Sequence, residues 1–280
     1  MLGKLIKYEI KATSRIFLPL YLVLILFAVI NYFMALGSGN FTLPKFITLT
    51  LYILILVGMF VVSFIVMLQR FYKNLLSEEG YLMFTLPVQP WKHIICKLIV
   101  SSIWTILSVI IAVISILIIA LQEVALTDIF NEISKIWSMM YQALGNKIYL
   151  YVIQFVTGAI VSLATSTLII YAAMAIGHLS NNHKILASIG SYLGLYTLSQ
   201  IVASIIFLLP LFQSQNTHYN INDMNLQLTG NQYANLYINI MGFRQMLPRF
   251  MWGAIALSAV FGAAYFIITD QILNKRLNLE

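Results

Sequence analysis

Charged residues are scarce in this sequence. Only 9% of its 280 residues are Asp, Glu, Lys or Arg, and 61% are hydrophobic. An ordinary soluble domain has about 25% charged and about 45–50% apolar residues. A soluble fold of this length has too little interior to hide so much apolar surface, so the sequence predicts a protein that lies largely in lipid.

Cysteine and the common catalytic motifs are also missing. The single cysteine, Cys96, excludes an internal disulfide and a cluster of thiolate ligands. The four histidines lack a spacing such as HExxH, and no lysine precedes Ser or Thr, which excludes a GxxxxGK[ST] phosphate loop. There is no GxSxG motif either. We therefore predict no catalytic, cofactor-binding or metal-binding residue and no enzyme activity in this chain.

A basic excess is present, with a formal net charge of +7. The lysines and arginines are scattered in small groups between apolar runs, not gathered in a stripe, so they do not indicate nucleic-acid binding. In a membrane protein such an excess reports orientation.

Six segments are long and apolar enough to cross a hydrocarbon core, which takes about 20 residues. They are residues 17–36, 46–68, 98–121, 148–176, 185–211 and 250–269. The first run is longer than the apolar region of a signal peptide, about 7–15 residues, so we expect it to be a retained span. The sequence predicts an all-α, polytopic membrane protein in which residues 1–280 form one transmembrane domain.

Orientation follows from the distribution of cations. With a cytoplasmic N-terminus, the inner segments hold eleven of the sixteen lysines and arginines and the outer segments hold five. The inner segments are residues 1–16, 69–97, 177–184 and 270–280. This bias predicts that both termini are cytoplasmic.

Residues 2–16 have the pattern of an amphipathic helix. Leu2, Leu5, Ile6 and Ile10 recur at helical spacing between lysines. We predict a short helix lying in the cytoplasmic interface. A cytosolic extension of the first span is the alternative.

Both long outer loops contain apolar stretches. In residues 122–147, Thr127 is a candidate N-cap and Gly145 a candidate C′ residue of a helix. One apolar stripe runs along this helix: Ile129, Phe130, Ile133, Ile136, Trp137, Met140, Tyr141 and Leu144. It indicates a connector resting on the outer leaflet or, alternatively, a surface that handles an amphipathic substrate. The loop at residues 212–249 is polar at first and then apolar enough to dip back into the membrane.

The predicted spans carry no charged residue near their middle. A buried charge is costly and is kept only for use, so its absence disfavours an ion-coupled carrier. Asn31, Gln154 and Gln200 remain as uncharged polar residues. Hydrogen bonds between helices explain them, and lining of a substrate path is a weaker hypothesis.

The cytoplasmic segment between the second and third spans is distinctive. Charged residues bracket an apolar core, Ser77 can cap a short helix, and Pro87 stops it. Pro90 can then begin the next helix. Exposed aromatic residues in such a helix need a hydrophobic groove, on another protein or in the interface.

The pattern Glu-Glu-Gly-x(4)-Thr-Leu-Pro-Val at residues 78–88 resembles the coupling segment of type-2 ATP-binding-cassette (ABC) exporter permeases. The layout of an amphipathic N-terminal helix, six spans, inner termini and a long outer loop is similar to theirs as well. In particular, the chain is similar to permeases of Gram-positive bacteria that export or expel amphipathic peptides, including bacteriocin-immunity and antimicrobial-peptide exporters. It departs from their pattern where Tyr81 follows Gly80 and where Cys96 precedes Lys97.

The resemblance implies a permease in a bacterial cytoplasmic membrane that exports a peptide or lipid-like substrate. The resemblance also implies that residues 75–88 dock on a separate ATPase subunit, which binds ATP and magnesium. It further implies that the chain pairs with a second permease copy, either identical or related. The residues that it assigns to coupling are Glu78, Glu79, Gly80, Tyr81, Leu82, Met83, Phe84, Leu86 and Pro87. For the two glutamates a solvated capping turn is the alternative.

Two other classes of function stay open. A membrane scaffold or sensor would need no ATPase partner. A secondary carrier or intramembrane enzyme would need ionisable groups in the spans, where the sequence shows none.

Overall fold

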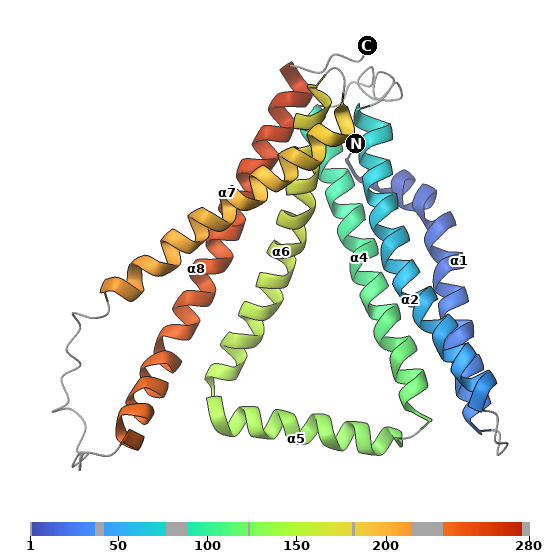
Figure 1. The fold of residues 1–280 in the computed structure, drawn as a ribbon, viewed down its shortest axis with the longest axis vertical. Coiled ribbons are helices and arrows are strands. Elements are labelled where there is room, and N and C mark those ends of the chain that lie inside the picture. Colours follow the sequence, from blue (N-terminus) through green and yellow to red (C-terminus); the bar gives the residue numbers. More distant parts are fainter. Residues whose placement is uncertain are drawn as a thin grey trace. The chain divides into compact units, whose positions relative to one another are not determined.

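The computed structural model describes most of the chain as helix. The described residues are 2–36, 42–76, 89–122, 124–180, 183–213 and 232–275. Their helices are α1 (Leu2–Leu36), α2 (Thr42–Phe71), the π-helical turn η1 (Tyr72–Leu76), α4 (Pro90–Ala120), α5 (Leu126–Leu144), α6 (Lys147–His178), α7 (Lys184–Gln213) and α8 (Gln232–Lys275) (Figure 1). The described residues contain no strand, which confirms the all-α prediction.

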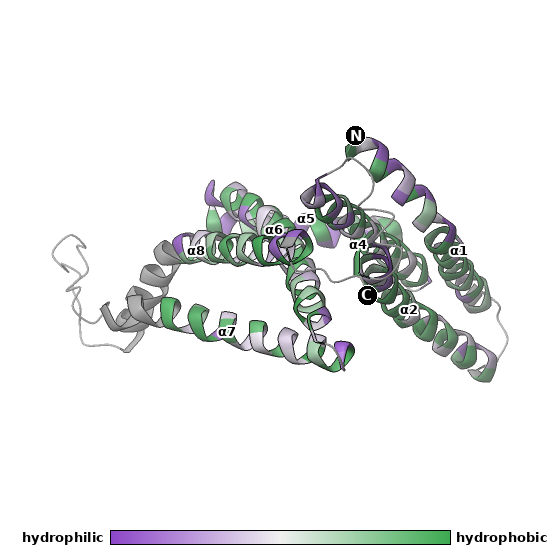
Figure 2. Ribbon diagram, turned by 90° about the horizontal axis from the view of Figure 1, so that it is seen from above, coloured by the Kyte–Doolittle hydropathy of each residue, from purple (hydrophilic) through white to green (hydrophobic). Residues whose placement is uncertain are grey.

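Six of the described helices, α1, α2, α4, α6, α7 and α8, are long and apolar enough to cross a membrane. Figure 2 shows that apolar residues dominate along α2 and α4, whereas polar residues gather at the N-terminal turns of α1. The prediction of a multi-pass membrane protein is therefore confirmed. The orientation of the termini stays a prediction.

Several helices extend beyond the predicted spans. Residues 2–16 are the first turns of the continuous helix α1, so they are not a helix separate from the first span. Their position in the interface stays a prediction. The final helix α8 begins at Gln232, so the second half of the predicted loop 212–249 is helical and continues into the last span.

The chain divides into two compact units. Unit 1 comprises residues 1–145 and 270–280, and unit 2 comprises residues 146–269. The sequence shows no boundary at these positions, because no linker of distinct composition separates the units. The prediction of a single domain is neither confirmed nor contradicted by this division.

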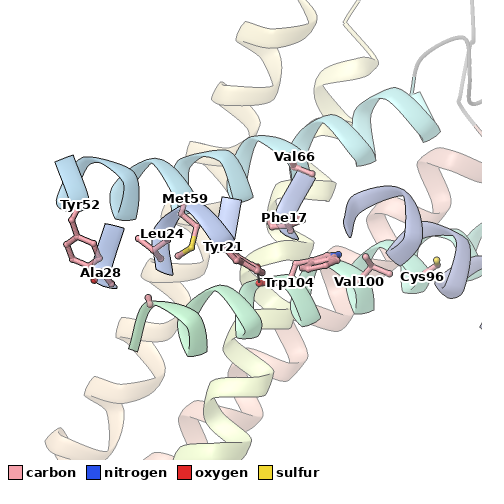
Figure 3. Close-up of a cluster of buried hydrophobic side chains, with 11 residues drawn as sticks. Phe17, Tyr21, Leu24, Ala28, Tyr52, Met59, Val66, Cys96, Val100 and Trp104 are labelled. Atoms are coloured by element: carbon pink, nitrogen blue, oxygen red, sulfur yellow. Dashed lines mark hydrogen bonds between the residues drawn. The ribbon is translucent and has the colours of Figure 1, made fainter. Parts of the chain in front are cut away.

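Unit 1 has its core between α1, α2 and α4. Figure 3 shows side chains from all three helices meeting there. The cluster consists of Phe17, Tyr21, Leu24, Ala28, Tyr52, Met59, Val66, Cys96, Val100, Trp104 and Ala112. Phe17 stacks on Trp104 with ring centroids 4.5 Å apart. Such stacked pairs add about 0.5–1.5 kcal/mol to the stabilisation from burial.

Hydroxyl pairs join the same three helices. Tyr21 and Ser108 share a hydrogen bond of 2.8 Å between α1 and α4, and Tyr52 and Ser115 share one of 2.8 Å between α2 and α4. Both serines are fully buried. Hydrophobic burial contributes little to the association of helices in lipid. Close packing of small residues and hydrogen bonds between hydroxyl groups hold the helices together instead.

Pro19 lies inside α1. Proline has no backbone N–H and its ring crowds the carbonyl four residues earlier, which bends a helix. Figures 1 and 2 show the N-terminal turns of α1 directed away from the axis of the rest of the helix. This bend carries Glu9 and Thr13 toward α4, as their contacts below show.

In unit 2, small residues let the helices approach closely. A Cβ atom placed on Gly262 of α8 would come within 2.9 Å of the Thr165 hydroxyl on α6. Beside this contact, the Thr165 hydroxyl donates to the Ser258 carbonyl at 2.9 Å. The same argument applies to Gly177 on α6, where an added Cβ would clash with Ser188 of α7. Glycine at these positions lets α6 pack against both neighbours.

Helix α5 confirms the predicted amphipathic helix between the third and fourth spans. It begins at Leu126 after Ala125, so the prediction of Thr127 as N-cap is wrong. Gly145 ends the helix with φ +57° and donates to the Tyr141 carbonyl at 2.7 Å, as the predicted C′ glycine would. Figure 1 shows α5 running across the end of α4.

The apolar stripe of α5 is exposed in unit 1. Phe130 is 68% exposed and Trp137 is 46% exposed. Only a few residues separate α5 from the ends of the apolar helices α4 and α6, so these short links hold it near the membrane surface. A helix held there and lined on one face by aromatic residues is expected to lie in the headgroup region.

We therefore expect cysteines on the two faces of α5 to react differently. In lipid vesicles, Met140→Cys on the apolar stripe should react with a water-soluble maleimide at least about tenfold more slowly than Ser138→Cys. To react, the cysteine on the stripe must bring apolar surface equal to two methylene groups from lipid into water, which costs about 1.6 kcal/mol. The native Cys96 is buried and provides the background. Equal labelling rates for the two variants would contradict this placement.

Candidate functional site

The predicted coupling residues, Glu78 to Pro87, lie outside the described residues. The structure describes their two flanks. On one side, η1 ends the second span with Leu75 and Leu76 fully buried. On the other side, Pro90 is the first residue of α4, as predicted, with Gln89 before it. The flank before the segment is therefore packed, whereas on the flank after it Gln89 is exposed and Pro90 is half-buried.

A buried ion pair ties the start of α4 to α1. Lys97 Nζ lies 2.6 Å from Glu9 Oε1, and the two side chains are only 4% and 10% exposed. Lys97 Nζ has no further hydrogen-bond partner among the described residues. Removing one partner from such a pair leaves an uncompensated charge and costs about 3–5 kcal/mol.

The second flank is tied to the same turn of α1. Arg70, in the last turn of α2, donates from Nη2 to the Ala12 carbonyl at 3.3 Å. Thr13 donates to the Glu9 carbonyl at 2.8 Å and accepts a bond of 2.7 Å from the Trp104 indole N–H. Residues 9–13 of α1 are therefore held by both helices that flank the predicted coupling segment.

We call Glu9, Ala12, Thr13, Arg70 and Lys97 the flank clamp. The clamp can transmit force, because displacement of either end of the 77–88 segment moves a residue bonded to α1. Its contacts range from 2.6 Å for Lys97–Glu9 to 3.3 Å for Arg70–Ala12, and four of its five residues contribute polar side chains. No chemistry beyond this mechanical linkage follows from its residue types.

Sequence reasoning missed this clamp. The pattern predicted Glu9 on an interfacial helix and Lys97 in a cytoplasmic segment, with no reason to pair them. One signal was available, since Glu9 is the only acidic residue among the basic ones of the N-terminal helix. The pairing itself depends on the bend of α1, which composition does not reveal.

The predicted substrate-path residues fall in different places. Asn31, in unit 1, is 3% exposed and is bonded to Thr48 of α2: Asn31 Nδ2 donates to the Thr48 carbonyl at 3.1 Å, and the Thr48 hydroxyl donates to Asn31 Oδ1 at 3.0 Å. It therefore joins two helices, which is the interhelical role that the sequence also allowed.

Gln154 has a similar role in unit 2. It is 1% exposed, and its Nε2 donates to the Pro248 carbonyl of α8 at 2.8 Å. Its Oε1 is buried and accepts no hydrogen bond within the described residues. Gln154 is not among the residues that line the cavity described next.

Gln200 lines a cavity of about 300 Å³ between α6, α7 and α8. The cavity lies wholly in unit 2 and is partly open. Its hydroxyl-bearing residues are Ser162, Thr165, Ser166, Tyr192, Tyr196, Ser199, Ser258 and Tyr265. The other lining residues besides Gln200 are Ile169, Ala203, Ala254, Leu257 and Phe261. No charged residue is among the described lining residues.

Nothing in the described residues suits a metal ion, since they hold no group of three or more His, Cys, Asp or Glu side chains placed to bind one.

Comparison of the chain with models of protein families, with curated proteins and with solved structures found no match. The assignment of a function therefore rests on the sequence pattern and on the contacts above.

The clamp makes a prediction about stability. Lys97→Met should lower the free energy of unfolding by about 3–5 kcal/mol, because Glu9 would stay buried without its partner. Thermal unfolding of the purified protein in detergent measures the change.

Lys135→Met is the matched control. Lys135 pairs with Glu132 at 3.6 Å, but these side chains are 59% and 68% exposed, and exposed pairs contribute about 0–1 kcal/mol. The double variant Glu9→Gln/Lys97→Met should recover much of the loss. If Lys97→Met and Lys135→Met unfold at the same temperature, the clamp does not stabilise unit 1.

Proposed function

We propose that this chain is the permease subunit of an ATP-driven ABC exporter whose ATPase is a separate subunit. Its six apolar helices are those of a multi-pass membrane protein. Its sequence has no phosphate-binding loop. In this proposal, ATP and magnesium are bound by a partner chain.

The flank clamp is the observation that carries the proposal. An ATPase that pulls on residues 77–88 would move Arg70 and Lys97, at the ends of the helices on either side. Both residues are bonded to one turn of α1. A displacement of the segment would therefore move α1, α2 and α4 together, as a semi-rigid body of the kind that conformational coupling requires.

The aromatic core of the segment supplies the docking surface in this proposal. Tyr81, Leu82, Met83, Phe84 and Leu86 would enter a hydrophobic groove of the ATPase, with Glu78 and Glu79 at the groove edge and Gly80 and Pro87 bounding the helix. Large apolar side chains seated in a groove provide most of the binding free energy of such interfaces. The resemblance at residues 78–88 supports this assignment.

A second copy of the permease, identical or related, completes the proposed transporter. The pair would act in a bacterial cytoplasmic membrane with both termini of each chain in the cytoplasm, as the cation bias indicates. The cargo would be an amphipathic peptide or a lipid-like molecule, because the spans offer uncharged and aromatic surfaces.

The first test is whether an ATPase is encoded beside this gene and co-purifies with the chain. Substrate-stimulated ATP hydrolysis is then measured. Phe84→Asp should weaken binding of the ATPase by about thirtyfold or more, since loss of a central apolar anchor costs at least about 2 kcal/mol. Stimulated hydrolysis should fall with it.

Phe130→Asp is the matched control, because it introduces the same charge on the exposed face of α5, on the predicted outer side. It should leave ATPase binding unchanged. If Phe84→Asp binds and couples like the natural protein, residues 78–87 are not the docking segment. If no ATPase associates with the natural chain, a scaffold or sensor becomes the better assignment.

A further inference from the structure

Helix α7 is unusual among the six apolar helices. None of its most apolar stretch is buried within the structure, and its mean hydropathy is the lowest of the six. Both views show α7 near α6 where the two helices are joined and diverging from it further along (Figures 1 and 2). It carries polar side chains, including Gln200, that face the cavity between α6, α7 and α8.

The cavity lies near mid-depth of the membrane if these helices span it. Its lining residues on α6 are 162–169, near the middle of residues 147–178. On α8 they are 254–265, near the middle of the apolar stretch 247–274. Hydrocarbon offers no hydrogen bonds at this depth, so polar groups there need a partner from protein, water or a ligand.

The polar groups of the cavity differ in whether they have partners in the described residues. Three of the smaller hydroxyls donate to backbone carbonyls: Thr165 to Ser258, Ser166 to Leu163, and Ser199 to Tyr196. By contrast, the side-chain amide of Gln200, which is an exposed residue, makes no hydrogen bond to any described residue. Tyr196 is 46% exposed. An amide that faces hydrocarbon without a partner costs several kcal/mol, so it needs water or a ligand in the cavity.

The lining restricts the chemistry of that occupant. A charged headgroup would lose its hydration and meet no opposite charge, a penalty of several kcal/mol. Neutral hydroxyl, ester or amide groups instead match the donors and acceptors of Gln200 and the tyrosine hydroxyls. The stacked pairs Tyr192–Tyr196 and Phe261–Tyr265 add flat apolar surface on two sides.

We propose that this cavity binds the uncharged polar head of a membrane lipid, such as a diacylglycerol, during its transfer between leaflets. The cavity is partly open and lies between spans, so a molecule already in the bilayer reaches it laterally while its acyl chains stay in hydrocarbon. Its volume of about 300 Å³ is at the lower end for ligand sites, which suits a small headgroup. This inference rests on the proposed export function and names its substrate class.

The experiment uses the full chain in lipid nanodiscs, without ATPase or ATP. Two photoreactive probes with the same acyl chains are compared: a diacylglycerol with a diazirine near its hydroxyl and the matching phosphatidic acid. The diacylglycerol should label residues 192–203 and 254–265, mapped by peptide mass spectrometry. The anionic probe should label them at least about tenfold less, which corresponds to about 1.4 kcal/mol.

Variants separate a site from general lipid contact. Gln200→Leu removes the free amide and should lower diacylglycerol labelling by about tenfold, the loss of a buried hydrogen bond. Ala203→Phe fills the cavity and should abolish labelling, with helicity and elution volume checked for intact folding. Tyr149→Phe is the control, because Tyr149 is an exposed tyrosine of α6 that does not line the cavity.

Four outcomes would overturn the proposal. The first two are equal labelling by both lipids and labelling that Ala203→Phe leaves unchanged. The third is preferential labelling by an uncharged apolar photoreactive peptide. The fourth is efficient formation of a disulfide between two Gln200→Cys chains, which would show that a second chain blocks the cavity. The last would make a second copy the occupant. Because labelling needs no ATPase, lipid binding with no ATPase association refutes only the export function. ATPase coupling without labelling refutes only this site.

Discussion

The pairing of polar groups inside an apolar chain is the constraint on which the rest of this structure depends. Lipid offers no hydrogen bonds, so every hydroxyl, amide or charge in the helices must find a partner within the protein or face a wet or occupied space. In unit 1 these partners are found between helices. Tyr21 meets Ser108, Tyr52 meets Ser115, and Lys97 meets Glu9. Each bond fixes the position of one helix along its neighbour. Apolar packing alone would specify that position less strictly.

The two units satisfy this constraint to different degrees. Unit 1 closes its polar groups into a three-helix core, and the flank clamp extends that core to the ends of the 77–88 segment. Unit 2 joins α6 to α8 through Gln154 and Thr165, yet leaves the polar face of α7 bordering a cavity. In the proposed exporter, unit 1 would receive force from the ATPase and unit 2 would offer its open polar groups to a ligand.

Hydrogen bonding distinguishes the three polar residues that the sequence offered for a substrate path. Asn31, Gln154 and Gln200 are equally plausible path residues from composition. In the fold, the side-chain amides of Asn31 and Gln154 donate hydrogen bonds to carbonyls of neighbouring helices. The Gln200 amide, which lines the cavity, makes no such bond. The difference arises because Gln200 is exposed on α7, whereas Asn31 and Gln154 are buried against neighbouring helices.

Composition and apolar run length were sufficient for the helical class, the six spanning segments, the amphipathic helix α5 and its C-terminal Gly145. These depend on local physics: lipid requires long apolar helices, and a left-handed turn favours glycine. The continuation of residues 2–16 into α1, the pairing of Glu9 with Lys97 and the cavity around Gln200 emerged only in the folded chain. They depend on the bend at Pro19 and on the angles between helices, which are set by contacts between residues that are distant in sequence.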